Sequence, residues 1–290
     1  MRIGIAMHNF GGLMRREAML AIAARAEELG YASLWTSDHL LVPSSYDRDF
    51  TDVFESLVTL AYLAGRTERI ELGTSVLVLS QRDPVLVAKQ AATIDALSGG
   101  RLRLGVGTGW IAEESELSGF PFAGRGRRMD EFIRALRELW TADDAAHAGE
   151  TLRFPDVRPS PRPVRPGGIP LLVGGNSSAA LRRAATLGDG WHALGLTPPA
   201  FRDAVARIAE LGGGRPFELS LRLGVALGQK PQPGRFAMVG GESAAVADSL
   251  ARYRAAGVEH LVADFQFTDL DSLLRALETF AHDVRPRLDG

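Results

Sequence analysis

Residues 70–110 limit the possible folds of this chain more than any other stretch. An apolar run at 70–79 is followed by a charged turn, a helical pattern that begins at Pro84, and a second apolar run at 102–106. Pro84 fits the first turn of a helix, and Gly99 fits the left-handed position just past its end. Two apolar strands joined by one helix are parallel neighbours in a buried sheet.

The same strand-and-helix unit recurs along the whole chain. The other expected strands are 2–8, 31–36, 169–173, 190–194, 218–227 and 258–265, and the helices are 15–29, 52–64, 84–97, 129–140, 179–187, 199–211, 243–256 and 269–284. A glycine separates helix from strand at Gly30, Gly188 and Gly257. Eight units in 290 residues predict an α/β fold, the (β/α)8 or TIM barrel, with residues 1–290 as one domain. An open doubly wound sheet is the alternative.

Composition excludes several classes of function. The net charge of −2 argues against a nucleic-acid or membrane-surface partner. Because the chain has no cysteine, it has no disulfide, thiolate nucleophile or cysteine metal site. It begins with a strand and holds no apolar run long enough to cross a membrane, so we expect a cytoplasmic protein.

Two segments fall outside the repeating pattern. Residues 40–51 form a polar loop after the second strand, and residues 145–168 contain five prolines interleaved with arginines. Such proline density predicts an extended segment. It is either an arginine-bearing lid for an anionic ligand or a stiff connector packed over the barrel.

Three common kinds of barrel chemistry have weak support. The active site of a barrel lies where its strands end, and His8, His39 and His192 stand at such ends. No His-x-His pair occurs, so we predict no metal site. Lys89 and Lys230 fall on a helix and in a loop, which argues against Schiff-base chemistry, and no Gly-x-Ser-x-Gly motif supports a serine hydrolase.

Two glycine-rich strand ends are candidate ligand contacts. Residues 174–177, Gly-Gly-Asn-Ser, precede a helix whose free N–H groups would bind a phosphate, with Arg182 and Arg183 one turn on. An ordinary helix cap is the alternative. Residues 105–109, Gly-Val-Gly-Thr-Gly, lack the third glycine of a dinucleotide fingerprint, and acidic residues follow them. We interpret them as a glycine wall against a planar ring.

Four larger side chains stand at the same strand ends. Asp38 and His39 follow the second strand, where a histidine beside a carboxylate is a candidate catalyst. Trp110 and Trp191 end two other strands and could flank a flat ligand, although tryptophan more often packs in a core.

Together these motifs resemble the luciferase-like monooxygenase superfamily, whose members bind a flavin or deazaflavin in the barrel mouth. The branch that the chain resembles most uses the deazaflavin coenzyme F420. The matching motifs run in order through nearly the whole chain, at residues 37–39, 73–77, 84–89, 96–101, 105–110, 174–177 and 188–191.

The resemblance implies hydride transfer between F420 and a small organic substrate, with FMN as the alternative cofactor, in a homodimer. It implies a cis peptide at Ser75–Val76 beneath the ring and a proton-transfer role for His39, with Asp38 beside it. The residues expected at the cofactor are His39, Ser75, Val76, Gly107, Thr108, Gly109, Gly174, Gly175, Asn176, Ser177 and Trp191.

Two departures from the family's sugar-phosphate dehydrogenases make their substrate doubtful here. Pro43 stands where they carry a tryptophan, and Trp110 stands where they carry a catalytic glutamate. Glu113 or Glu114 could replace that acid, but we expect both to be exposed at a helix start. An FMNH2-dependent monooxygenase and a non-catalytic ligand-binding barrel are the competing hypotheses.

Overall fold

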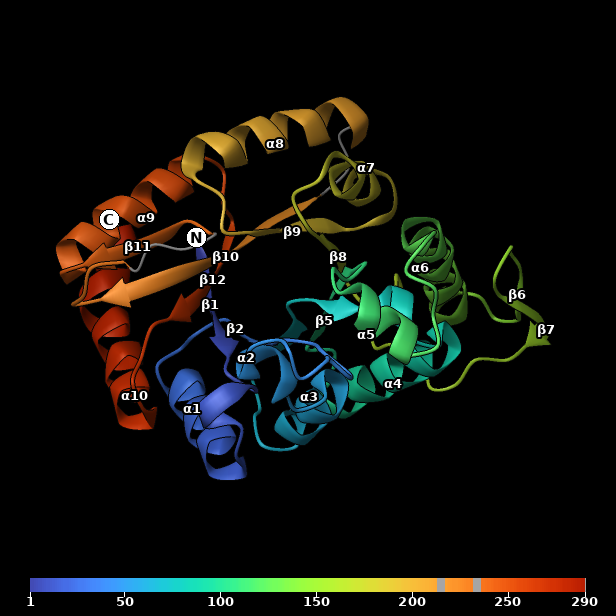
Figure 1. Cartoon of the computed structure of the whole chain (residues 1–290), viewed down its shortest axis with the longest axis horizontal. Coiled ribbons are helices and arrows are strands. Elements are labelled where there is room, and N and C mark those ends of the chain that lie inside the picture. The colour runs from blue at the N-terminus through green and yellow to red at the C-terminus, as the bar shows by residue number, and fades with distance from the viewer. Residues whose placement is uncertain (213–216, 232–235, 290) are drawn as a thin grey trace.

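The computed structural model of the chain describes residues 1–212, 217–231 and 236–289. In this part of the chain, eight parallel strands close into a barrel (Figure 1). Their order around the barrel is β1 (Arg2–Met7), β2 (Ser33–Thr36), β3 (Glu71–Thr74), β5 (Leu102–Gly107), β8 (Leu171–Gly174), β9 (Gly190–Leu194), β10 (Glu218–Leu227) and β12 (His260–Phe265). Because β9 pairs with β10 and β12 pairs with β1, the barrel is closed. The predicted (β/α)8 fold is therefore confirmed.

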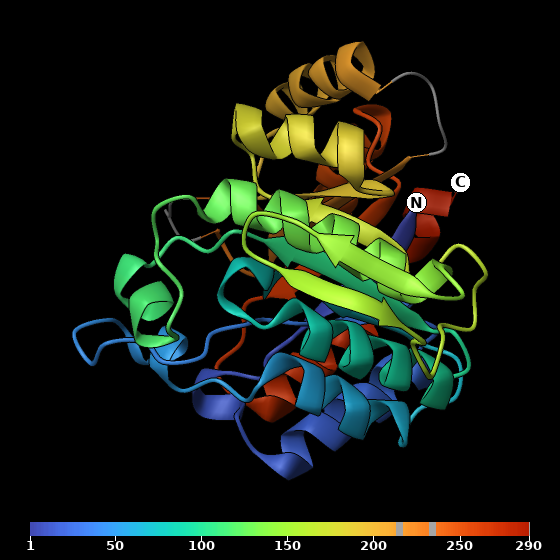
Figure 2. The ribbon, with the colours of Figure 1, turned by 90° about the vertical axis from the view of Figure 1, so that its right-hand side faces the viewer.

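Helices cover the outside of the barrel, as the two ribbon views show (Figures 1 and 2). They are α1 (Arg16–Glu28), α2 (Arg48–Thr51), α3 (Ser56–Ala64), α4 (Pro84–Leu97), α5 (Ala112–Leu117), α6 (Arg125–Thr141), α7 (Ser178–Leu187), α8 (Pro198–Gly212), α9 (Ser243–Ala255), α10 (Leu270–Thr279) and α11 (Arg285–Asp289), with a π-helical turn at Phe280–Val284. The eight predicted helices all form. The short helices α2, α5 and α11 were not expected.

Glycines end the helices as predicted, with one exception. Gly30, Gly99 and Gly257 have φ angles of 72°, 67° and 100°, which only glycine adopts readily. Gly188 is extended instead, with φ −89° and ψ 162°. A Cβ at Gly188 would lie 3.0 Å from the carbonyl oxygen of Gly190, so close packing explains this glycine.

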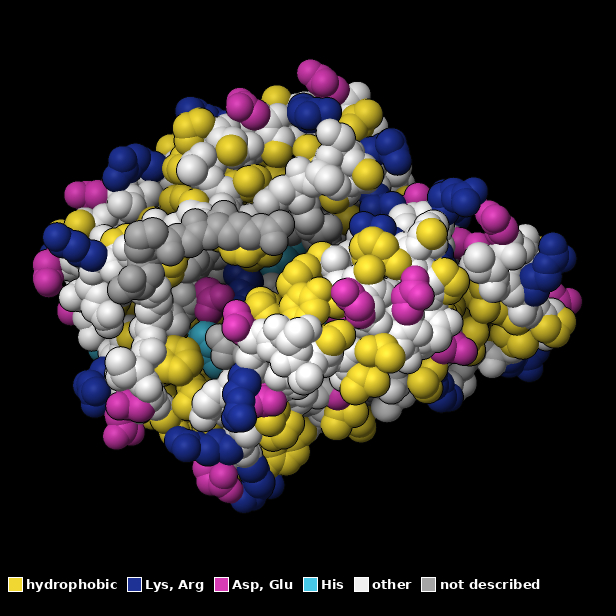
Figure 3. Space-filling model, viewed as in Figure 1, with side chains coloured by type: hydrophobic (Ala, Val, Ile, Leu, Met, Phe, Trp, Pro, Cys, Tyr) yellow, Lys and Arg dark blue, Asp and Glu magenta, His cyan; other side chains and the backbone are white. Residues whose placement is uncertain are grey.

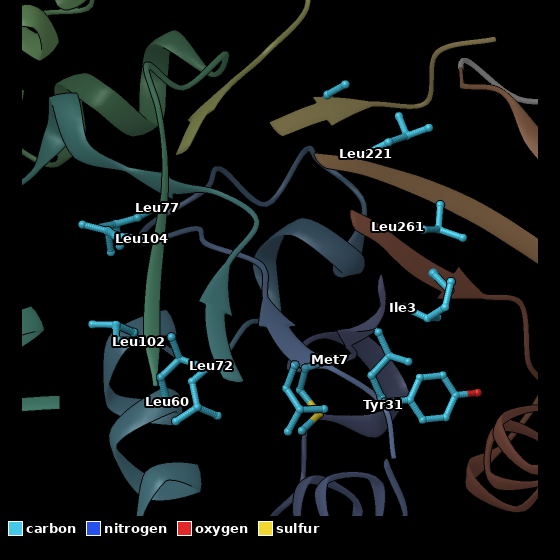
Figure 4. Close-up of a cluster of buried hydrophobic side chains, with 14 of the residues drawn as sticks. Ile3, Met7, Tyr31, Leu60, Leu72, Leu77, Leu102, Leu104, Leu221 and Leu261 are labelled. Atoms are coloured by element: carbon cyan, nitrogen blue, oxygen red, sulfur yellow. The ribbon is translucent and has the colours of Figure 1, made fainter. Parts of the chain in front are cut away.

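The main apolar core lies between the barrel and its helices. Alternate side chains of each strand point outward into this layer, which Figure 4 shows in part with Ile3, Leu72 and Leu104. A separate small cluster lies inside the barrel and consists of Ala6, Trp35, Leu172 and Val262.

The rest of the barrel interior is polar. We call the end where the strands begin the floor and the end where they finish the mouth. Trp35 stacks on His192, with ring centroids 5.0 Å apart, and the His192 Nε2 atom lies 2.8 Å from the Ser75 hydroxyl near the mouth. On the floor side, the Trp35 indole donates to the Ser33 hydroxyl, which lies 2.8 Å from the His260 Nε2 atom. A series of hydrogen bonds, interrupted by the stack of Trp35 on His192, therefore runs from one end of the barrel to the other.

The proline-rich segment forms a hairpin outside the barrel (Figure 2). Its strands β6 (Ala145–Ala148) and β7 (Arg153–Val157) are antiparallel, and Glu131 on α6 accepts backbone hydrogen bonds from Thr151 and Leu152 at its turn. Further on, the Val164 N–H donates to Asp95 on α4. These contacts with outer helices support the connector interpretation.

Two smaller strands extend the sheet. β4 (Leu77–Val78) pairs with β5 beside the mouth, and β11 (Met238–Gly241) pairs with the outer part of β10. None of the helices in the described chain is both long and apolar enough to span a membrane.

Candidate active site

The mouth of the barrel opens on the face seen in Figure 1. The space-filling view of this face shows a hollow near its middle, with basic, acidic and histidine side chains at its bottom (Figure 3). The strand ends that carry the predicted site residues surround this mouth.

The segment after β3 makes one wall of the mouth. The predicted strand at 70–79 is interrupted, because the Ser75–Val76 peptide bond is cis, as the family resemblance implies. The Ser75 hydroxyl lies 2.8 Å from His192, and the Ser75 carbonyl oxygen accepts a hydrogen bond of 3.2 Å from Arg222. Ser75 and Val76 are half-buried, so this wall faces the open end of the barrel.

The glycines around this wall have a different purpose from the one expected. A Cβ at Gly107 or Gly174 would lie 2.7 Å from a methyl group of Val76, and one at Gly109 would lie 2.7 Å from Val78. A side chain at any of these positions would therefore collide with valine side chains of the same chain. Close packing against the wall accounts for these glycines, and their contact with a planar ring stays a prediction.

His39 forms a pair with a carboxylate that we expected to be exposed. Its Nδ1 atom lies 3.0 Å from the Glu114 Oε2 atom, and the Leu40 N–H donates to Glu114 Oε1 at 2.6 Å. Only 1% of the Glu114 side chain is exposed. The expectation was wrong for this residue because α5 turns it back toward the end of β2. Glu113, the preceding residue, is exposed as expected.

Glu114 is a hydrogen-bond acceptor in this site. Burial acts to raise the pKa of the Glu114 carboxyl, but hydrogen bonds from His39 and the Leu40 N–H outweigh it and lower the pKa below its usual value. An ionised carboxylate can only accept, so His39 must carry its proton on Nδ1.

Aromatic rings surround the other sides of His39. The ring centroids of Phe50 and Trp110 lie 5.5 and 6.3 Å from that of His39, and Tyr46 lies 5.9 Å from Trp110. Half of the Trp110 surface is exposed. Trp110 thus stands at the mouth as predicted, packed on Phe50 with their ring centroids 5.4 Å apart.

Asp38 has a different partner from the one its place in the sequence suggests. Its Oδ2 atom accepts from the Val78 N–H at 2.8 Å, and its Oδ1 atom lies 2.5 Å from Arg82. The side chain is fully buried. Asp38 therefore joins the end of β2 to β4, and this geometry does not support a catalytic role beside His39.

The sequence analysis missed a charged cluster at the mouth. Arg222 donates twice to Asp264, at 2.8 and 3.0 Å, and also to the Ser37 hydroxyl at 3.0 Å. On the other side of Asp264, the His8 Nε2 atom lies 3.4 Å from its Oδ1 atom. Burial acts to raise the pKa of Asp264, but Arg222 and His8 lower it overall. Strict alternation along β10 and β12 would have indicated that both residues point inward.

The residues before α7 are exposed, and one of them forms the helix cap that the alternative interpretation predicts, while an anion site here stays a prediction. Gly175, Asn176 and Ser177 are exposed, and the Ser177 hydroxyl caps the helix by accepting from the Ala180 N–H at 3.2 Å. The Asn176 side chain holds the loop through two hydrogen bonds to the backbone of Leu194.

Two residues expected to contact the ligand near this loop do not face the mouth. Trp191 is fully buried and stacks on Phe201 on the outside of β9, because His192 takes the inward position. Its indole donates to the Gly175 carbonyl oxygen at 2.7 Å, so it supports the loop from behind. Arg183 is buried and bonded to Asp130, so it is not available to an anion.

Metal chemistry gains no support from the described residues, which contain no cluster of three or more His, Asp or Glu side chains that could hold a metal ion.

Comparisons with known proteins give a consistent result. The model of the luciferase-like monooxygenase family matches residues 1–233. An uncharacterized protein of Mycobacterium tuberculosis is 40% identical over 217 residues, which are 69% of this chain and 74% of that protein. The F420-dependent glucose-6-phosphate dehydrogenase of Amycolatopsis mediterranei is 35% identical over 177 residues, which are 60% of this chain and 52% of that protein. The crystal structure of monooxygenase RslO1 from Streptomyces bottropensis has the same fold, with a TM-score of 0.85, 20% identity and 99% coverage of both chains.

Proposed function

The chain belongs to the luciferase-like monooxygenase family and is an oxidoreductase; from this premise we propose that it transfers a hydride between coenzyme F420 and a small organic substrate at the barrel mouth. One observation carries the proposal. The Ser75–Val76 wall, His39 and the exposed start of α7 all stand at the same end of the barrel, the place where barrel enzymes bind ligands.

Hydrogen bonds between these three parts fix their positions relative to one another. Arg222 donates to the hydroxyl of Ser37, two residues before His39, and to the carbonyl oxygen of Ser75 in the wall. Ser75 in turn contacts His192 on β9, and the Gly175 N–H donates to the His192 carbonyl oxygen at 3.3 Å. A ligand that spans the mouth would therefore meet three sets of groups in a fixed arrangement.

Each part fits one portion of a deazaflavin nucleotide-like cofactor. The half-buried Ser75 and Val76 would support the ring, and the backbone N–H groups that begin α7 would bind a phosphate, with Ser177 beside them. F420 supplies the hydride chemistry when bound, while the protein supplies orientation and proton transfer. His39 would hold or release the proton that accompanies the hydride.

Sequence similarity to a relative that is named as F420-dependent favours F420 over FMN as the cofactor. The relative from Amycolatopsis mediterranei is F420-dependent at 35% identity, whereas the likeness to monooxygenase RslO1, at 20% identity, concerns the fold alone. An FMNH2-dependent monooxygenase is the second candidate function.

The substrate that we infer is not a sugar phosphate. The side chains packed around His39 are the rings of Phe50 and Trp110, which favour a substrate with an apolar face. By the resemblance, Pro43 and Trp110 also stand where the sugar-phosphate dehydrogenases of the family carry a tryptophan and a catalytic glutamate.

Cofactor binding tests the proposal directly. Purified protein is titrated with oxidised F420 and with FMN, and the dissociation constants are measured by fluorescence. We expect F420 to bind at least about 100-fold more tightly than FMN, which corresponds to about 3 kcal/mol. Tighter binding of FMN would favour the monooxygenase, and binding of neither cofactor would contradict both candidate functions.

A charge placed at the start of α7 tests the phosphate site. Ser178→Asp adds a carboxylate to the first turn, where it suits the helix dipole and preserves folding but repels a phosphate. We expect F420 affinity to fall about tenfold, equivalent to about 1.4 kcal/mol. Ala244→Asp, at the second position of α9, is the matched control and leaves the affinity unchanged.

A further inference from the structure

A buried carboxylate beside an exposed reaction site requires an explanation. Glu114 is 1% exposed, and removing a charge from water is costly unless hydrogen bonds compensate for it. Its two oxygens are directed at consecutive residues, with Oε2 at the His39 ring and Oε1 at the Leu40 N–H. The nearby Gln81 side chain also acts to lower the pKa of this carboxyl.

We propose that Glu114 is a positioning residue that keeps the His39 proton on Nδ1 and leaves Nε2 as the nitrogen that exchanges a proton with the substrate. This inference rests on the proposed function of the same site. Glu114 itself contacts neither substrate nor cofactor, because the imidazole ring of His39 lies between the carboxylate and the Nε2 atom.

The neighbouring charged groups do not compete for this role. Asp38 is bonded to Arg82 and the Val78 N–H, and Glu113 is exposed, with its carboxylate 3.4 Å from the Tyr46 hydroxyl. Among the described residues, Glu114 is thus the acidic group in hydrogen-bond contact with His39.

The geometry at Leu40 predicts what happens when the charge is removed. In Glu114→Gln, the amide oxygen would take the place of Oε1, because the Leu40 N–H needs an acceptor. The amide NH2 group would then face His39 Nδ1, which must become an acceptor. The neutral ring would therefore carry its proton on Nε2, the opposite tautomer.

A purely structural role for Glu114 predicts a different result. If the carboxylate only ties the loop after β2 to α5 and does not set the state of the His39 ring, the tautomer is the same in the wild type and in Glu114→Gln. The tautomer of His39 therefore distinguishes positioning from anchoring.

The experiment is a nitrogen-15 NMR measurement on the full-length protein labelled at histidine, without cofactor. The chain has six histidines, and the signals of His39 are assigned by their loss in His39→Gln. We expect the Nδ1–H tautomer in the wild type, the Nε2–H tautomer in Glu114→Gln, and the wild-type pattern in the control variant Glu113→Gln.

Several outcomes would overturn the inference whether or not the protein binds F420. An Nε2–H tautomer in the wild type would do so even if Glu114→Gln failed to fold, and an unchanged tautomer in folded Glu114→Gln would do so as well. F420 titration of the wild type is run in parallel. Failure of the wild type to bind F420 counts against the proposed function, whereas the His39 tautomer counts for or against the positioning role of Glu114 alone.

Discussion

The barrel contains two histidine–glutamate pairs of nearly equal geometry, one at the mouth and one at the floor. At the mouth, His39 Nδ1 lies 3.0 Å from Glu114, and at the floor, His260 Nδ1 lies 3.1 Å from Glu218. The surroundings of the two rings differ. About 12% of the His39 side chain is exposed, whereas His260 is buried and its second nitrogen lies 2.8 Å from the Ser33 hydroxyl.

This difference separates a histidine available for chemistry from one that is part of the core. Burial, together with the nearby guanidinium groups of Arg2 and Arg103, lowers the pKa of His260 to about 3. The ring is therefore neutral and hydrogen-bonded to Glu218, not ion-paired with it. The contact between a histidine and a carboxylate does not by itself identify a catalyst. The two pairs differ in whether the second ring nitrogen is already hydrogen-bonded within the core.

The largest expected effect is a loss of stability in mild acid. Burial lowers the pKa of both His192 and His260 to about 3, against about 6.5 in an unfolded chain. Between pH 6.5 and 5 the unfolded state therefore binds protons that the folded state does not, so the free energy of unfolding decreases as the pH is lowered. We expect a loss of about 2 kcal/mol for each histidine, or about 4 kcal/mol in all. Urea unfolding at pH 7 and pH 5 measures it.

One variant sharpens this prediction at the floor. His260→Gln removes one of the two groups, so the difference in unfolding free energy between pH 7 and pH 5 should fall by about half. His282→Gln, at an exposed position of the π-helical turn, is the control. An unchanged pH dependence in His260→Gln would mean that the floor histidine is not buried as a neutral ring.

The second prediction compares the two carboxylates. Glu218 is bonded to Arg103 as well as to His260, and only 8% of the Arg103 side chain is exposed. Glu218→Gln leaves this buried guanidinium with the Glu71 carboxylate, 3.5 Å away, as its described ion-pair partner, so we expect a loss of about 3 kcal/mol in unfolding free energy. Glu114→Gln, which unpairs no guanidinium among its described contacts, should cost less. An equal loss of unfolding free energy in both variants would contradict the view that the floor pair stabilises the fold more than the mouth pair does.

The third prediction uses two glycines as matched probes. A Cβ at Gly4 on β1 would lie 2.1 Å from the Ser33 hydroxyl, so Gly4→Ala should disturb the floor and cost about 2 kcal/mol of stability. A Cβ at Gly174 would displace the half-buried Val76, so Gly174→Ala should mainly weaken F420 binding, by about tenfold. Gly12→Ala, whose Cβ would meet nothing within 4 Å, is the control for both measurements.

The fold was predictable because its signals are local. Apolar runs, helical spacing and glycines between helix and strand are read within ten or fifteen residues, and β9 and β10 begin and end where the sequence predicts. The assignment of residues 1–290 to one domain, the homodimer and the cytoplasmic location stay predictions.

The site was predictable only in part, because its decisive contacts join distant residues. Glu114 meets His39 across 75 residues, and Arg222 meets Ser37 across 185. Neighbours in sequence were misleading, since Asp38 turns to Arg82 and Trp191 points outward while His192 points inward. The glycines at the mouth could not be interpreted correctly until Val76 was seen to fill the space beside them.

The proposed proton transfer at His39 depends on a segment added to the barrel. The carboxylate that contacts His39 comes from α5, a six-residue helix outside the repeating strand-and-helix pattern. An exchange of residues 110–118 would therefore retune proton transfer while the eight strands remain untouched. In directed evolution, a library limited to these nine positions would explore reactivity, with the buried Ile111, Glu114 and Ser115 as the three positions that also bear on packing.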